Sequence, residues 1–134
     1  MLQPNVTMNV RKAGPQTCVM DVQGEINAAA EPALMDAYNQ ACVNGARSIV
    51  MNFNNLEYTN SSGIGLLVTL LIRVRRQNQR LMAFGLNEHY RQIFELTRLN
   101  EAISIYESEA EALNSVGGPA ASSSGDSVKP AAAV

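Results

Sequence analysis

The chain has 134 residues, 46% hydrophobic and 16% charged, which is enough to bury the core of one domain. Its net charge of -2 argues against a general nucleic-acid binder. Two cysteines, Cys18 and Cys42, match no zinc motif, and we expect both to be buried free thiols. No segment resembles a signal peptide or is apolar for long enough to span a bilayer, which favours a cytoplasmic protein.

The first part of the chain predicts a β-hairpin followed by a helix. Alternating apolar residues indicate strands at 6–10 and 17–23, joined by a turn. Residues 24–27 are expected to leave the sheet, and Asn27 to cap a helix that ends near Val43. One face of this helix is apolar at helical spacing, through Leu34, Ala37, Tyr38, Ala41 and Cys42.

The remainder predicts alternating strands and helices. The β-branched run 48–53 is typical of a central buried strand. It is followed by a helix over about 61–78, a strand at 81–85, a helix from the cap Asn87 to about Asn100, a strand at 103–106, and a helix opened by the capping box of Ser108 and Glu111. The order β-β-α-β-α-β-α-β-α predicts an α/β fold with a mixed sheet of about five strands and four helices. We expect residues 1–116 to form the domain and the low-complexity residues 117–134 to be disordered.

The stretch 58–65 connects the central strand to a strongly apolar helix, and we expect function to reside there. Its Asn and Ser residues suit the free N–H groups of a first helical turn, whose positive end also favours a phosphate. A nucleophile elbow is absent, the only histidine is His89, and the glycines at 63 and 65 lack the third glycine of a dinucleotide loop. No cluster of metal ligands is present, so neither catalysis nor a cofactor is expected.

Two interpretations of this stretch remain from the residues alone. In the first, Asn60 or Ser61 only caps the helix. In the second, the helix also docks a partner, because its apolar residues occupy two faces. We expect one face in the core, formed by Ile64, Leu67, Val68, Leu71, Ile72 and Val74. Leu66 and Leu70 lie off that face and are expected to contact a partner.

Two motifs resemble those of STAS domains, a family that includes the bacterial anti-sigma factor antagonists. Residues 60–65, Asn-Ser-Ser-Gly-Ile-Gly, resemble the family's Asp-Ser-Ser/Thr-Gly-Leu/Ile-Gly, and residues 24–27, Gly-Glu-Ile-Asn, resemble its Gly-Glu-Leu/Ile-Asp. The order of strands and helices agrees from about Val6 to Leu113. The resemblance therefore implies a STAS-type α/β sheet over nearly the whole chain except its C-terminal tail.

The resemblance also implies a protein-binding switch. In the family, the serine after the motif's acidic residue is phosphorylated by an anti-sigma factor that is a serine kinase, and a serine phosphatase reverses this. That position is Ser61 here. The unphosphorylated form binds the anti-sigma factor and frees the sigma factor. Implied partner-binding residues, together with those expected from the helix surface, are Asn27, Asn60, Ser61, Ser62, Gly63, Ile64, Leu66 and Leu70.

The chain departs from the family pattern in that Asn60 and Asn27 replace its acidic residues. This leaves open a STAS scaffold or transporter-associated subunit that is never phosphorylated. A small nucleotide-binding or hydrolytic enzyme, indicated only by the glycines and Ser61, is a more distant alternative. The basic cluster of 73–80 suits the negative end of its helix, with phosphate or acidic-partner binding as the alternative.

Overall fold

The computed structural model describes residues 5–117, which form one five-stranded sheet in the order β1-β2-β3-β4-β5. The strands are β1 Val6–Gly14, β2 Thr17–Ile26, β3 Ser48–Thr59, β4 Arg80–Phe84 and β5 Ser104–Tyr106. The α-helices are α1 Glu31–Val43, α2 Ser61–Arg76, α3 Glu88–Leu96 and α4 Glu109–Gly117. Two short 3-10 helices are η1 Ala28–Ala30 and η2 Leu99–Glu101. The predicted element order and α/β class are confirmed. The predicted tail lies outside the described residues, except for Gly117, which ends α4.

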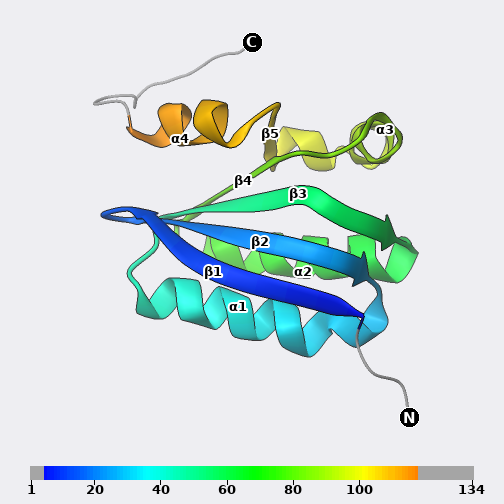
Figure 1. The fold of residues 1–134 in the computed structure, drawn as a ribbon, viewed down its shortest axis with the longest axis horizontal. Helices are drawn as coiled ribbons and strands as arrows, with labels where there is room; N and C mark the ends of the chain where they lie inside the picture. The colour runs from blue at the N-terminus through cyan, green and yellow to red at the C-terminus, as the bar shows by residue number, and fades with distance from the viewer. Residues whose placement is uncertain (1–4, 118–134) are drawn as a thin grey trace.

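The sheet combines one antiparallel hairpin with three parallel pairings. β1 and β2 pair antiparallel, and β3, β4 and β5 each join the sheet parallel to the preceding strand. Each parallel connection contains a helix, because the chain must cross back along the sheet before the next parallel strand can begin. α1 and α2 lie on one face and α4 on the other (Figure 1).

Hydrophobic side chains fill the space on both sides of the sheet. The larger cluster includes Leu34, Ile49 and Leu70, and α3 joins it through Phe94, whose ring meets Phe53 edge-on at a centroid distance of 6.4 Å. The smaller cluster, under α4, contains Val19, Val50, Met82, Phe84 and Ala112. The sheet therefore holds α2 on its more extensively packed side, which fixes the face that α2 can bury.

Three strands run further than the sequence indicated, and the first of them, β1, continues from the predicted end at residue 10 to Gly14. Residues 24–26 stay in β2 instead of leaving the sheet, and β3 continues to Thr59. Register shifts interrupt the β2–β3 pairing, and in β3 the two-residue alternation that marks a strand is lost at Asn54 and Asn55, which are both exposed. Gly24 has φ of +104°, and a Cβ at this position would clash with the backbone oxygen of Asn5. Glycine is therefore required inside the strand rather than at its exit.

Some predictions about the helices were also wrong. α3 ends at Leu96, because Arg98 adopts the left-handed conformation, with φ of 62°, and a short 3-10 helix follows.

The two free cysteines differ in exposure. Cys18 is buried as expected, and burial raises the pKa of its thiol. Cys42 is exposed, because it lies beside the buried face of α1 and not on it.

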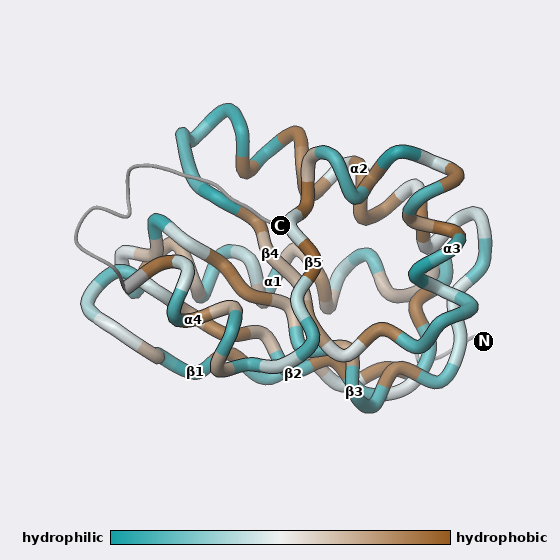
Figure 2. The backbone as a smooth tube through the Cα atoms, turned by 90° about the horizontal axis from the view of Figure 1, so that it is seen from above, coloured by the Kyte–Doolittle hydropathy of each residue, from teal (hydrophilic) through white to brown (hydrophobic). Residues whose placement is uncertain are grey.

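The predicted caps at Asn60, Asn87 and Ser108 are confirmed, whereas Asn27 caps the 3-10 helix η1 and not α1, whose N-cap residue is Ala30. Asn60 and Asn87 each accept a hydrogen bond from the third residue of their helix, at 2.9 Å. The hydroxyl of Ser108 accepts from the backbone N–H of Glu111 at 3.2 Å, although the Glu111 carboxylate turns back to the N–H of Glu107 and not to that of Ser108. The tube of α2 alternates between hydrophobic and hydrophilic residues (Figure 2). Within residues 5–117, every helix is too short or too polar to cross a lipid bilayer.

Candidate functional site

The ends of β2 and β3 bring the two sequence motifs together. Ile26 and Thr59 are paired residues of the parallel strands, and each is followed directly by an asparagine. Asn27 accepts a hydrogen bond from the N–H of Ala29, and Asn60 accepts one from the N–H of Gly63, both at 2.9 Å. The two asparagines therefore begin the helical segments at one edge of the sheet. Both do so through a neutral side-chain oxygen.

A buried threonine fixes the start of α2 against this edge. The Thr59 hydroxyl donates to the backbone oxygen of Ile26 at 2.9 Å. The Thr59 N–H donates to the hydroxyl oxygen of Tyr90 at 3.2 Å, which connects α3 to the same point. A Cβ at Gly63 would clash with the Thr59 hydroxyl and the Ile26 carbonyl oxygen. Glycine is therefore required for the first turn of α2 to approach the sheet this closely.

Ser61 and Ser62 are the first two residues of α2, and both are exposed. Within residues 5–117 neither hydroxyl makes a hydrogen bond. The Asn60 side chain serves the N–H of Gly63 and the Asn60 carbonyl serves that of Ile64, so the N–H groups of the two serines are left for solvent or for a ligand. The positive end of α2 adds to a local environment that favours negative charge.

The buried face of α2 differs from the predicted one. It consists of Gly63, Leu67, Leu70 and Val74. The expectation that Leu70 is exposed is wrong, because its side chain has 0% exposure, and Leu66 is half-buried against the core. Val68 and Ile72, which we expected in the core, are 39% and 47% exposed. The contact of Gly63 with the sheet sets the rotation of the helix and so determines which apolar residues face inward.

The exposed apolar residues lie on the same side of α2 as Ser61. At 100° per residue, Ser61, Val68 and Ile72 fall within about 20° of one line along the helix, and the buried face is centred roughly 150° away. Ile64, partly buried, lies beside that line. We call Ile64, Val68 and Ile72 the α2 ridge. A partner that contacts Ser61 could therefore contact these residues as well.

Other candidate chemistry can be placed as well. His89 is an exposed residue of the first turn of α3, and its ring lies 5.0 Å from that of Tyr90 between centroids. Among residues 5–117, no three His, Cys, Asp or Glu residues are grouped in a way that could hold a metal ion. From the sequence, no role is assigned to Tyr90. A tyrosine in that position carries a hydroxyl that needs a partner when buried, and this was the available signal.

Comparison with known proteins agrees with this arrangement. Residues 8–112 match the family model of the STAS domain. The chain belongs to the STAS domain family. It is 25% identical over 107 residues to an anti-sigma-B factor antagonist of Listeria monocytogenes, covering 80% of this chain and 94% of the relative. The identity to that of Staphylococcus aureus is 28% over 86 residues, covering 64% and 80%.

Solved structures show the same fold. An anti-sigma factor antagonist from Mycobacterium paratuberculosis is 20% identical, with a TM-score of 0.71, over 87% of this chain and all of that one. The antagonist SpoIIAA in its unphosphorylated form is 20% identical, with a TM-score of 0.67, over 84% and 99%. The chain is thus a STAS domain with relatives named as anti-sigma factor antagonists.

Proposed function

We propose that this STAS domain is an anti-sigma factor antagonist that is switched by phosphorylation of Ser61. Unphosphorylated, it binds an anti-sigma factor that is also a serine kinase and so frees a sigma factor. Phosphorylated, it releases that partner until a serine phosphatase resets it. The observation that carries the proposal is the position of Ser61: exposed, first in α2, and in line with the α2 ridge.

The contacts of α2 support a switch that works without unfolding. A phosphate adds about 1.5 to 2 negative charges and three acceptor oxygens at neutral pH. The free N–H groups and the positive end of α2 accommodate these in the isolated domain. The solved likeness to SpoIIAA extends to its phosphorylated form, with a TM-score of 0.65 at 22% identity, so this fold is compatible with a phosphorylated chain.

The same charge has a different effect in a complex. Covering Ser61 with a partner removes water from the phosphate, and a desolvated charge without a cationic partner costs several kcal/mol. In the free protein the phosphate stays in water, so this desolvation cost does not arise. A phosphate on Ser61 therefore destabilises the complex more than the free domain, and the partner is released.

A scaffold that is never phosphorylated is the second candidate, and the two asparagines favour it. Asn27 and Asn60 keep the caps but remove two carboxylates from the edge of the sheet where a kinase would deliver its phosphate. A carboxylate there could position the serine hydroxyl or a nucleotide-bound metal ion, whereas an amide lacks the charge to do so.

The test is phosphorylation with a purified anti-sigma factor kinase from the same genome and MgATP, followed by intact mass and phosphosite mapping. We expect one phosphate at Ser61 and none on Ser61→Ala. Ser62 serves as the matched control, since it is also exposed and lies one residue further along α2. Modification of Ser62 alone, or of serines in 118–134, would refute the assignment. A chain that binds the kinase stably but accepts no phosphate would favour the scaffold.

A further inference from the structure

The last part of β3 extends beyond its neighbour β4. β4 pairs with β3 only from Ser48 to Asn52, whereas β3 continues to Thr59 and pairs with β2 as far as that residue. Within the described chain, the backbone of 53–59 therefore has a strand partner on one side only. A buried N–H group on the open side needs an acceptor from elsewhere.

Helix α3 supplies that acceptor. Its Phe94 ring meets the Phe53 ring edge-on, and its Tyr90 hydroxyl accepts the N–H of Thr59 at 3.2 Å. The bond is buried, and Tyr90 has only 7% exposure. Removing the hydroxyl would leave a buried N–H without this acceptor, which is unfavourable. Tyr90 thus holds the end of β3, directly before α2.

Ser61 lies between two fixed points of the backbone. Two residues before it is Thr59, held by Tyr90 and, through its own hydroxyl, by β2. Two residues after it is Gly63, whose N–H donates to the Asn60 side chain at 2.9 Å. Among residues 5–117 the Ser61 hydroxyl makes no hydrogen bond, so its position follows from the backbone that carries it. Loosening Thr59 would therefore displace Ser61 without removing a contact of Ser61 itself.

We propose that Tyr90 is a positioning residue for the phosphorylation of Ser61, an inference that rests on the proposed function. In the transfer, Ser61 Oγ attacks the γ-phosphorus of ATP, the bond from that phosphorus to the leaving oxygen of ADP breaks, and the serine proton passes to a base of the kinase. Reacting atoms must lie about 3 to 3.5 Å apart, and a displacement of about 1 Å can cost roughly a hundredfold in rate. Because Tyr90 is buried, it acts on this alignment through Thr59 and not by contact with ATP.

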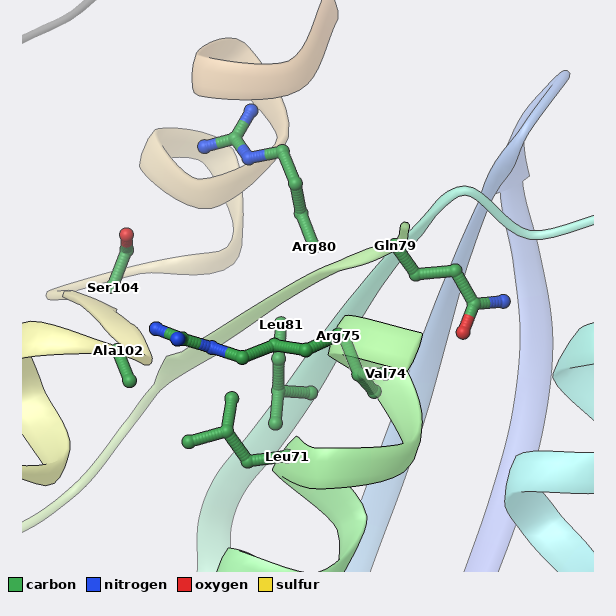
Figure 3. A pocket seen from close by; sticks show the side chains of 8 residues that line it. All are labelled: Leu71, Val74, Arg75, Gln79, Arg80, Leu81, Ala102 and Ser104. Atoms are coloured by element: carbon green, nitrogen blue, oxygen red, sulfur yellow. The ribbon is translucent and has the colours of Figure 1, made fainter. Parts of the chain in front are cut away.

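Tyr38 offers a matched control at the other end of α2. It is also buried, with 4% exposure, and its hydroxyl donates to the Gln79 side chain at 2.8 Å and to the Arg73 carbonyl oxygen at 3.4 Å. Gln79 comes just after the helix, where β4 begins (Figure 3). Arg73 lies about 18 Å along α2 from Ser61, at 1.5 Å per residue. Tyr38→Phe and Tyr90→Phe thus each remove one buried hydroxyl, at opposite ends of α2.

The test measures steady-state phosphorylation of the parent, Tyr90→Phe and Tyr38→Phe, with a purified anti-sigma factor kinase from the same genome and MgATP, below the lowest Tm. We expect Tyr90→Phe to lower kcat by roughly tenfold through misalignment. Its KM should stay within about twofold, because the exposed surface that meets the kinase is unchanged. Tyr38→Phe should lower Tm to a similar extent and keep kcat and KM within about twofold of the parent.

Amide hydrogen exchange followed by NMR locates the loosening without the kinase. The amides of Thr59 and Gly63 should exchange faster in Tyr90→Phe, because their bonds fix the start of α2. The Gln79 amide, which donates to the Val74 carbonyl oxygen at 2.9 Å, should exchange faster only in Tyr38→Phe.

The two proposals fail in different ways. Tyr90→Phe with the kcat of the parent, equal loss of kcat in both variants, or a loss confined to KM overturns the positioning role alone. Unchanged exchange of the Thr59 amide in Tyr90→Phe does the same. A parent chain that accepts no phosphate on Ser61 refutes the proposed switch, and the positioning role with it.

Discussion

Leu70 and Ile72 are two aliphatic residues of α2 that should respond oppositely to substitution. Leu70 has 0% exposure and belongs to the main core cluster, whereas Ile72 is 47% exposed. Leu70→Ala leaves a cavity under α2 and should cost about 2 to 5 kcal/mol of unfolding free energy. Ile72→Ala loses only the buried half of one side chain, about 1 kcal/mol or less.

These costs translate into separable measurements. Small domains have unfolding free energies of about 5 to 15 kcal/mol, so Leu70→Ala removes a large fraction of the total. With about 4 °C per kcal/mol for a domain of this size, Tm should fall by roughly 8 to 20 °C for Leu70→Ala and by roughly 4 °C or less for Ile72→Ala. Urea unfolding followed by far-UV circular dichroism gives the free energies directly, with Val74→Ala as a second buried position on the same face.

The binding measurement should reverse the order. Ile72→Ala removes a contact from the α2 ridge and should weaken binding of the anti-sigma factor. The folded fraction of Leu70→Ala should bind it like the parent. Isothermal titration below the lower Tm provides the affinities. Equal loss of stability in both variants would refute the assigned rotation of α2. A normal affinity for Ile72→Ala would remove the ridge from the docking surface.

Three further predictions test the site and its support. Ser61→Glu should weaken the affinity for the anti-sigma factor by roughly tenfold or more and change the unfolding free energy by about 1 kcal/mol at most. Ser61→Ala should bind like the parent, and titration calorimetry with melting curves measures both effects. Gly63→Ala should lower Tm clearly, because the added methyl group meets the Thr59 hydroxyl and a carbonyl oxygen; an unchanged Tm would contradict the close approach. Arg11 lowers the pKa of Asp21 and of Glu109, so its network stabilises the fold above their ordinary pKa values near 4 and loses this as pH falls through the depressed values. Urea unfolding between pH 7 and pH 2 should show a shallower acid loss in Arg11→Met, and identical pH profiles would contradict it.

Local features of this chain could be predicted from sequence, because the interactions that produce them are local. The caps at Asn60, Asn87 and Ser108 depend on a side chain and an N–H three residues away, and all three are found. The order of strands and helices follows from runs of apolar residues and the turns between them. The closeness of Asn27 and Asn60 is explained in the same way, since each directly follows one of two adjacent parallel strands.

The errors came from contacts between distant segments. Apolar residues cover more than one side of α2, so periodicity alone does not decide whether Leu70 or Ile72 faces the sheet. The decision is made by Gly63, whose missing side chain lets α2 rest on the carbonyl oxygen of Ile26. In the same way, residues 24–26 remain in β2 because they pair with the end of β3. The local sequence of β2 carries no information about this distant partner.

The rotation of α2 determines how a phosphate on Ser61 could be sensed by a partner protein. Ser61 lies on the opposite side of the helix from Leu67, Leu70 and Val74, so a phosphate there touches no core side chain. The hydrogen bonds that anchor the helix start belong to Asn60 and Thr59, and neither requires the Ser61 hydroxyl. In the proposed switch, a phosphate on Ser61 therefore acts through the surface that a partner covers, by charge and desolvation at the start of α2.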